Sequence, residues 1–199
     1  MRNTLQEYYH GLEQASQALI ATDSDPQHRA QAVHALLNDS PSDSACQKAC
    51  AHCCHFPVGV RFGEALLLAE AIADDPTLRM RLAREADATA DAAWNDLTGR
   101  RCPLLHNEHC ARYESRPTPC RALHSRDADA CARSLSDPVA VPRDESAWWR
   151  GLGTAAAIDE RCGARELRSA VHAILALADR SDLESAATAF ANARGVPGT

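Results

Sequence analysis

The sequence is poor in aromatic residues, which make up 5% of its 199 residues, and Lys48 is its only lysine. It has no apolar run of about 18 residues, so no membrane-spanning helix is predicted. The first ten residues lack the apolar centre of a signal peptide, so we expect no secretory leader and a reducing, cytoplasmic location. The formal net charge of -6 argues against a nucleic-acid-binding protein, because such proteins normally carry a basic excess.

Alternation of apolar and polar residues, the pattern of a half-buried strand, is also missing. Alanine supplies much of the 45% hydrophobic content, and alanine-rich segments favour helices. We therefore predict an all-α fold, a small helical domain with two irregular cysteine-rich loops forming a metal site. The domain would span 1–199, with a metal-binding core at 46–121 and a C-terminal helical extension at 145–195.

Apolar periodicity and capping signals predict the individual helices. Asp25-Pro26 and Asp75-Pro76 each combine an N-cap with a proline at the first helical position. Ser181-Asp-Leu-Glu184 has the pattern of a capping box. Gly99 and Gly195 are expected to end helices, and Gly163 to separate two of them. The predicted helices cover 4–21, 26–37, 61–73, 76–97 and 127–135, and the chain is helical again from Glu145.

Nine cysteines are present, and in a reducing compartment they indicate metal or redox ligands rather than disulfides. Four of them lie within nine residues: Cys46, Cys50, Cys53 and Cys54. Thiolates are soft ligands that suit zinc, copper(I) and iron–sulfur clusters. Spacings of two or three residues let one loop place several sulfurs around one centre. Buried structural cysteines, the alternative, usually occur singly.

Two familiar motifs resemble this first group of cysteines without matching it fully. A c-type haem requires Cys-x-x-Cys-His, but Cys54 follows Cys53 and His55 comes one place late. The spacing from Cys46 to Cys53 also matches the cluster-binding spacing of radical SAM enzymes. The strand–helix repeats of their barrel are absent from this sequence, so we discount that match.

A second group comprises Cys102-Pro103 and the segment from Cys110 to Cys120-Arg121, which includes Tyr113 and Arg116-Pro117. Together with the first run, it resembles the CxxCxxCC-type cysteine-cluster family of putative zinc- or iron-chelating proteins, which includes flagellin lysine-N-methylase-like proteins. The resemblance covers roughly 46–121, where three separate spacings agree. Leu104 and Arg112 depart from the family pattern at non-ligand positions. The resemblance implies metal binding more strongly than any reaction.

The resemblance implies seven cysteine ligands: Cys46, Cys50, Cys53, Cys54, Cys102, Cys110 and Cys120. One tetrahedral metal takes four ligands, so either two metals share the site or some cysteines lie outside the ligand set. Cys131 is a candidate spare ligand, whereas Cys162 is expected to be merely buried. Glu64, close to the first loop, is a candidate hard ligand for iron. His side chains in the two loops are further candidate ligands: His52, His55, His106 and His109. The simpler interpretation is that each is solvated or hydrogen-bonded.

Six arginines and two acids lie between Arg100 and Arg126, a local charge of +4. These arginines could stabilise thiolates, or they could attract an anionic small molecule or protein partner. Arg116, Arg121 and Tyr113 are candidate cofactor-binding residues. The alternatives are that Arg116 fixes a turn and that Tyr113 packs.

The leading hypothesis is an iron–sulfur protein, for example with a 4Fe-4S cluster, that has a redox, sensing or substrate-binding role. The first alternative is a structural zinc module that mediates protein interaction. The second is an iron-dependent enzyme, or one related to protein-lysine methylation. No Gly-rich phosphate loop, Gly-x-Ser-x-Gly or His-Glu-x-x-His motif occurs, so no catalytic residue is predicted. Neither a nucleic-acid nor a membrane partner is expected, and the sequence does not indicate an oligomeric state.

Overall fold

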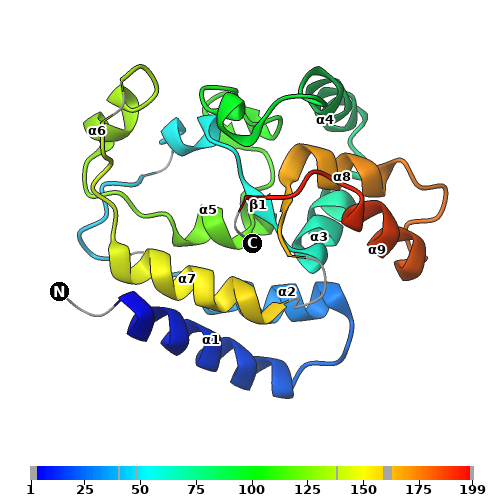
Figure 1. Cartoon of the computed structure of the whole chain (residues 1–199), viewed down its shortest axis with the longest axis horizontal. Helices are drawn as coiled ribbons and strands as arrows, with labels where there is room; N and C mark the ends of the chain where they lie inside the picture. Colours follow the sequence, from blue (N-terminus) through cyan, green and yellow to red (C-terminus); the bar gives the residue numbers. More distant parts are fainter. Residues whose placement is uncertain (1–3, 40, 48, 138, 159–162, 198–199) are drawn as a thin grey trace.

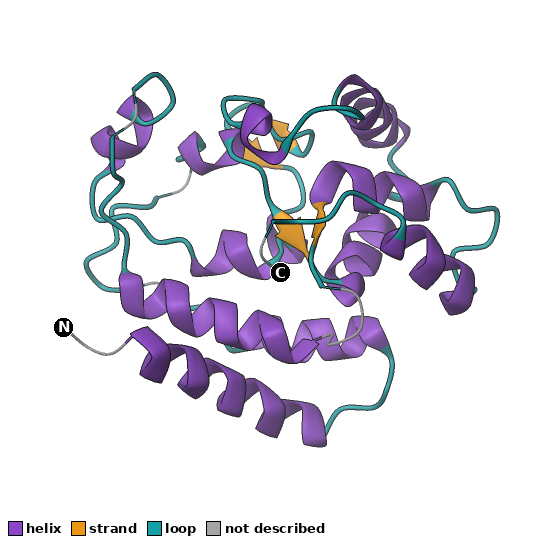
Figure 2. Ribbon diagram, viewed as in Figure 1, coloured by secondary structure: helices purple, strands orange, loops and turns teal. Residues whose placement is uncertain are grey.

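The computed structural model describes residues 4–39, 41–47, 49–137, 139–158 and 163–197. Helices dominate this part of the chain, and its strands form two short antiparallel pairs (Figures 1 and 2). The prediction of a mainly helical protein is confirmed. The two strand pairs were not predicted, because strands of two residues are too short to show an alternating pattern.

Helices α1 (Thr4–Ile20) and α7 (Glu145–Ile158) lie side by side along one edge of the molecule (Figure 1). Their backbones approach closely at glycines: a Cβ on Gly153 would lie 1.9 Å from the carbonyl oxygen of Tyr8. Helix α2 (Pro26–Ala35) begins after Asp25, whose carboxylate accepts the N–H groups of Gln27 and His28. Together these helices bury a small apolar cluster: Ala15, Leu19, Ala30, Val33, Ala157 and Ile158, with Leu67 from the next helix.

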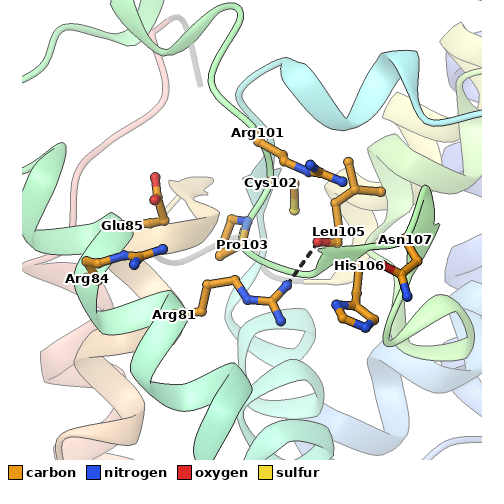
Figure 3. Close-up of a pocket in the computed structure, with 9 residues that line it drawn as sticks. All are labelled: Arg81, Arg84, Glu85, Arg101, Cys102, Pro103, Leu105, His106 and Asn107. Atoms are coloured by element: carbon orange, nitrogen blue, oxygen red, sulfur yellow. Dashed lines mark hydrogen bonds between the residues drawn. The ribbon is translucent and has the colours of Figure 1, made fainter.

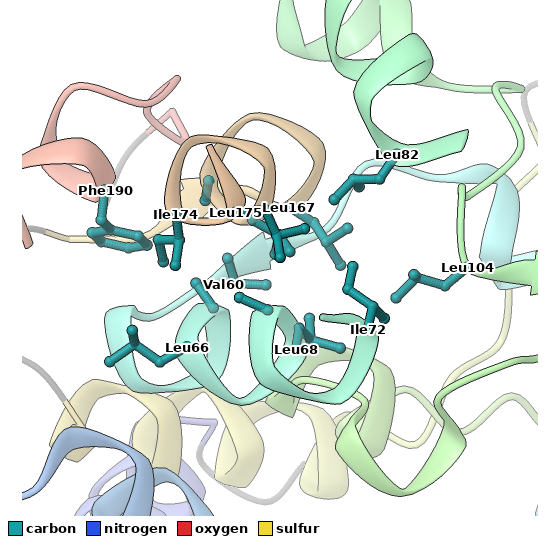
Figure 4. Close-up of a cluster of buried hydrophobic side chains, with 14 of the residues drawn as sticks. Val60, Leu66, Leu68, Ile72, Leu82, Leu104, Leu167, Ile174, Leu175 and Phe190 are labelled. Carbon is teal, nitrogen blue, oxygen red and sulfur yellow. The ribbon is translucent and has the colours of Figure 1, made fainter. Parts of the chain in front are cut away.

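Helix α3 (Phe62–Ile72) lies between this cluster and a larger one, which explains its continuous apolar run. Leu67 faces the first cluster, whereas Leu66 and Leu68 pack into the second. The second cluster also takes side chains from α4 (Pro76–Ala88), α8 (Leu167–Leu175) and α9 (Leu183–Ala191) (Figure 4). Leu104, which directly follows Cys102-Pro103, is part of this larger cluster. The larger core thus anchors the segment that carries Cys102.

Helices α4 and α9 both end before their predicted positions. Helix α4 starts at Pro76 as predicted but ends at Ala88, where the Thr89 hydroxyl donates to the carbonyl of Glu85. The alanines beyond Ala88 offer too little apolar area to hold another two turns against the core, and the chain re-forms only a short 3-10 helix, η2 (Trp94–Leu97). Helix α9 ends at Ala191, before Gly195.

Short elements connect the cysteine loops to this scaffold. The first loop contains the 3-10 helix η1 (His52–His55) and leads to β1 (Gly59–Val60), which pairs with β4 (Arg165–Glu166). In the second loop, β2 (Leu105–His106) and β3 (His109–Cys110) form a hairpin. Asn107 and Glu108 both have positive φ, as a two-residue type I′ turn requires. The elements η3 (Tyr113–Ser115), α5 (Thr118–Ala122) and α6 (Ala128–Arg133) follow.

Within the described ranges, no helix combines the length and the apolar character that crossing a bilayer requires.

Candidate metal centre

Backbone hydrogen bonds join the two cysteine loops directly. The N–H of Cys102 donates to the carbonyl of Cys54 over 2.7 Å, and the N–H of Gly99 donates to the carbonyl of His55 over 2.7 Å. At the start of the first loop, the Ser125 N–H donates to Cys46 Sγ over 3.3 Å. The structure therefore brings the predicted cysteine loops into one region, although about 50 residues separate them in the chain.

The cysteines of the second loop are partly buried, and the pKa values of their thiols reflect that position. Burial raises the pKa of Cys102 to about 11. Burial also raises the pKa of Cys120 well above 9.0, and negative charge on Cys53, Cys102 and Cys110 raises it further. A charge on Cys53 in the first loop thus acts on the thiol of Cys120 in the second.

Cys53 and Cys54 are adjacent in the first loop, and each affects the pKa of the other. The Cys54 thiol donates to Cys53, which lowers the pKa of Cys53 to about 7 and raises that of Cys54. The positive charge of Arg116 favours the Cys53 thiolate further. These interactions favour the thiolate form of Cys53, which is the form that binds a metal. Its charge adds to the effect of burial, which raises the pKa values of Cys50, Cys110 and Cys131.

The cysteines of both loops lie in one region, but those that the structure describes are not arranged as a metal-coordination site. Within the described residues, no three Cys, His, Asp or Glu side chains already surround a point where a metal ion could sit. The donor chemistry fits a soft metal, since thiols from two loops share one region beside an arginine. Binding would require thiols to rotate toward a common centre and to release protons, and metal affinity would therefore depend on pH.

Glu64 connects the scaffold to the segment that carries Cys120. It is fully buried; its Oε1 accepts the Thr118 N–H at 2.6 Å and lies 3.0 Å from His34 Nε2. Its Oε2 accepts the Arg61 N–H at 2.8 Å. Burial alone would raise the pKa of Glu64, but the bonds from these groups outweigh it and lower the pKa. Protein groups occupy both oxygens, so Glu64 positions α5 in this structure instead of offering an iron ligand.

Arg121 holds the second loop closed. Its side chain is buried and donates to the carbonyls of Glu114 and Arg116 and to Asn38 Oδ1. All of these bonds are to protein groups, and they tie the loop to the end of α2. The structure gives Arg121 the loop-fixing role that sequence reasoning considered for its neighbour Arg116.

Arg116 and Tyr113 form an exposed pair beside the thiols. The Arg116 guanidinium stacks 3.7 Å from the centre of the Tyr113 ring and also donates to the Tyr113 carbonyl. The ring itself is 57% exposed. The charge of Arg116 lowers the pKa values of both Cys53 and Cys110, opposing the effect of burial in the second. Arg116 thus stacks on Tyr113 and lies close enough to the thiols for its charge to act on them. The cofactor-binding role of both residues stays a prediction.

Sequence reasoning missed a buried ion pair that supports the second loop. Arg168 donates to Glu166 over 2.8 Å, and both side chains are at most 2% exposed. Arg168 also donates to the carbonyls of Arg100 and Arg101, immediately before Cys102. Its charge partly offsets the effect of burial on Cys102. Nothing in the local sequence distinguishes this pair from charges on a solvated face, because the signal lies in the tertiary contact.

The remaining candidates take different positions. His55 hydrogen-bonds the carbonyl of Ala51, His106 and His109 are exposed on the hairpin, and His52 is partly buried in η1. Cys131, on α6, hydrogen-bonds Ser125, and its pKa responds to charge on Cys46, Cys50 and Cys53. Cys131 is thus on the first-loop side of the thiol region. Cys162 lies outside the described residues.

Comparison with known proteins is consistent with this arrangement. Residues 45–137, slightly less than half of the chain, match the CxxCxxCC family, which is described as a putative zinc- or iron-chelating domain. The match confirms the predicted resemblance and supports metal binding by this segment. It includes both cysteine loops and Cys131 but not α7, α8 or α9. No match was found among curated proteins or among solved structures.

Proposed function

We propose, for a chain whose residues 45–137 match the zinc- or iron-chelating CxxCxxCC family, that the two cysteine loops hold an iron–sulfur cluster. The observation that carries the proposal is the meeting of the loops at the Cys102–Cys54 hydrogen bond, with thiols from both sides in electrostatic contact. Clusters of this kind are held by cysteine thiolates from such runs. The bound cluster would supply redox or Lewis-acid chemistry.

The electrostatic interactions among the thiols favour two sets, with Cys53 acting on members of both. Cys120 responds to charge on Cys53, Cys102 and Cys110, and Cys54 responds to Cys53, Cys102 and Cys120. We assign the cluster to this inner set: Cys53, Cys54, Cys102, Cys110 and Cys120. Cys46 and Cys50 interact instead with Cys131 and Cys53. They form an outer set, which could take a second metal or provide exchangeable ligands.

The loop contacts favour a role beyond structural stapling. A structural zinc ion holds together segments that would otherwise separate. Here the loops are already joined by the Cys102 and Gly99 backbone bonds, and Arg168 holds the chain at Arg100 and Arg101. A metal is therefore not needed to close them. This leaves electron transfer, sensing or substrate binding as the roles that the cluster best fits.

Metal content and colour test the proposal. Protein purified without oxygen should be brown, with broad visible absorption, and should contain iron together with acid-labile sulfide. Cys120→Ser and Cys53→Ser should lose most of the iron and sulfide, whereas Cys46→Ser should retain more. Cys162→Ser, outside the matched segment, is the control and should keep the full content. Circular dichroism of each variant shows whether its helices are intact.

The alternatives give different results. Colourless protein with stoichiometric zinc would replace the proposal with a zinc site. Iron without sulfide would indicate a non-haem iron centre, and would favour the iron-dependent enzyme. Full iron and sulfide in a folded Cys120→Ser variant would overturn the assignment of the inner set.

A further inference from the structure

A pocket of about 270 Å³ lies between α4 and the segment 101–107 (Figure 3). Arg81, Arg84 and Glu85 line it from the helix, and Arg101, Cys102 and His106 from the loop. The volume is slightly below the range typical of drug-sized ligands, so it suits a small one. Neither the family description nor the proposed metal role accounts for this pocket.

The lining is basic in a protein that is acidic overall. Three guanidinium groups and one carboxylate line the pocket, whereas the whole chain carries a net charge of -6. The Arg84 side chain forms no hydrogen bond or ion pair with any residue that the structure describes. A concentration of positive charge in a hollow focuses the field there and attracts anions.

The three arginines differ in how far they are committed to the protein. Arg81 donates from Nη1 to the carbonyl of Leu105 over 2.9 Å, which ties one edge of its guanidinium group to the loop (Figure 3). Arg101 pairs with Glu108, but both side chains are more than half exposed, and exposed pairs of this kind contribute little stability. A ligand that binds Arg101 more strongly than Glu108 does can therefore replace that pair at small cost. Arg84 can bind a ligand without giving up such a pair.

We propose that this pocket binds a small oxyanion, a carboxylate- or phosphate-bearing molecule, between Arg84, Arg81 and Arg101. The planar guanidinium group presents paired N–H donors that match the oxygens of either group. Glu85 at the rim disfavours anions that do not reach the arginines, and gives an ammonium or hydroxyl group of the ligand an acceptor. The occupant would be small, because the pocket holds only a few functional groups.

The position of Cys102 connects the pocket to the thiol region. Cys102 lines the pocket and belongs to the inner set of thiols, so an oxyanion bound here lies beside the centre that the proposed function places there. This connection rests on the proposed function, but the pocket itself does not. Its walls are joined by the Arg81–Leu105 bond, and Arg168 holds the backbone at Arg101. The pocket should therefore bind its ligand with or without metal.

Calorimetric titration of the full chain with pyrophosphate and with citrate, at low and matched ionic strength, tests the proposal. Arg84→Glu should weaken the binding of at least one probe by about tenfold or more, as expected for losing a charge-assisted contact and adding repulsion. Arg79→Glu is the matched control: it makes the same charge change on the same helix, but Arg79 lies outside this pocket. It should change the affinity by less than about threefold.

Each outcome decides the matter. Absence of binding by both probes, or equal losses in the Arg84 and Arg79 variants, would overturn the proposal. A selective loss in the Arg84 variant of chelator-treated protein supports the pocket even if no cluster is ever found. A change in the visible spectrum of metal-loaded protein on adding the probe, absent in Arg84→Glu, would support the connection to the metal; an unchanged spectrum despite binding would overturn that connection alone.

Discussion

The backbone N–H of Cys102 lies 2.7 Å from the carbonyl oxygen of Cys54, so a hydrogen bond, not a metal, closes the contact between the two loops. Arg112 adds a second tie, donating to the carbonyl of Ala71 and to Asp75 on the scaffold. These bonds belong to the polypeptide alone. Hydrogen bonds of the protein itself therefore hold the frame of the proposed metal site.

Removal of the metal should therefore leave the helices in place. A metal present at about 1,000 times its Kd contributes about 4 kcal/mol to stability, and its loss should lower Tm by roughly 10 °C in a chain of this size. Far-UV circular dichroism of chelator-treated protein should keep most of the helical signal. Complete loss of that signal on chelation would show that the metal, and not the hydrogen-bonded frame, holds the fold.

Arg168→Met should destabilise the protein and reduce its metal content together. The change leaves Glu166 buried without its partner, which costs about 3–5 kcal/mol, and frees the carbonyls of Arg100 and Arg101 beside Cys102. Denaturant unfolding measures the first effect and metal analysis the second.

A double variant distinguishes the effect of the unpaired buried charge from the effect of losing the hydrogen bonds to the loop carbonyls. Arg168→Met with Glu166→Gln removes the unpaired buried charge, so part of the lost stability should return. The metal content should stay low, because neither substitution restores the donors to the loop carbonyls. Recovery of both properties would show that the pair affects metal binding only through global stability.

The sequence contained enough information for most helices and for the composition of the site. Asp25-Pro26 and Asp75-Pro76 start α2 and α4 because cap and proline act locally, within one turn. The contact between Cys54 and Cys102 could be inferred only from a family pattern, since local spacing does not report which distant loop lies nearby. The structure places the loops together, while the ligand set itself stays a prediction.

Other features depend on tertiary contacts that no local pattern encodes. Glu64 looked like a possible iron ligand because it follows the first loop, yet burial with His34 and Thr118 gives it a structural role. The same reason hid Arg168, whose carbonyl partners in the second loop lie 67 and 68 residues away. The end of α4 at Ala88 was missed because alanine has high helix propensity but little area to bury.

The contact between α1 and α7 predicts a strong effect of a single methyl group. In Gly153→Ala the new Cβ would lie 1.9 Å from the Tyr8 carbonyl oxygen and 3.1 Å from the Leu12 nitrogen, both backbone atoms. The helices must separate, which should cost about 1–3 kcal/mol or more. Gly195→Ala is the control, because a Cβ there meets nothing within 4 Å. Equal unfolding free energies for both variants would contradict the close packing.

Glu64 makes stability depend on pH in a defined direction. Its folded-state pKa is lowered below the ordinary value of 4.5, so its contribution is fully present above that pH and is lost as the pH falls through the folded-state value. Glu64→Gln should lower the unfolding free energy by about 1.5–3 kcal/mol at neutral pH, the usual range for hydrogen bonds to a charged group. The difference from wild type should shrink as the pH falls below about 4.5.

Measurements on chelator-treated protein isolate this effect, because metal binding has its own pH dependence. Glu70→Gln is the matched control: it removes an exposed carboxylate from the same helix, and the change should stay within about 0.5 kcal/mol at every pH. A gap between wild type and Glu64→Gln that stays constant down to about pH 3 would mean that the carboxylate charge is not what stabilises the fold. The gap would then reflect a difference between the two side chains that does not depend on the ionisation of Glu64.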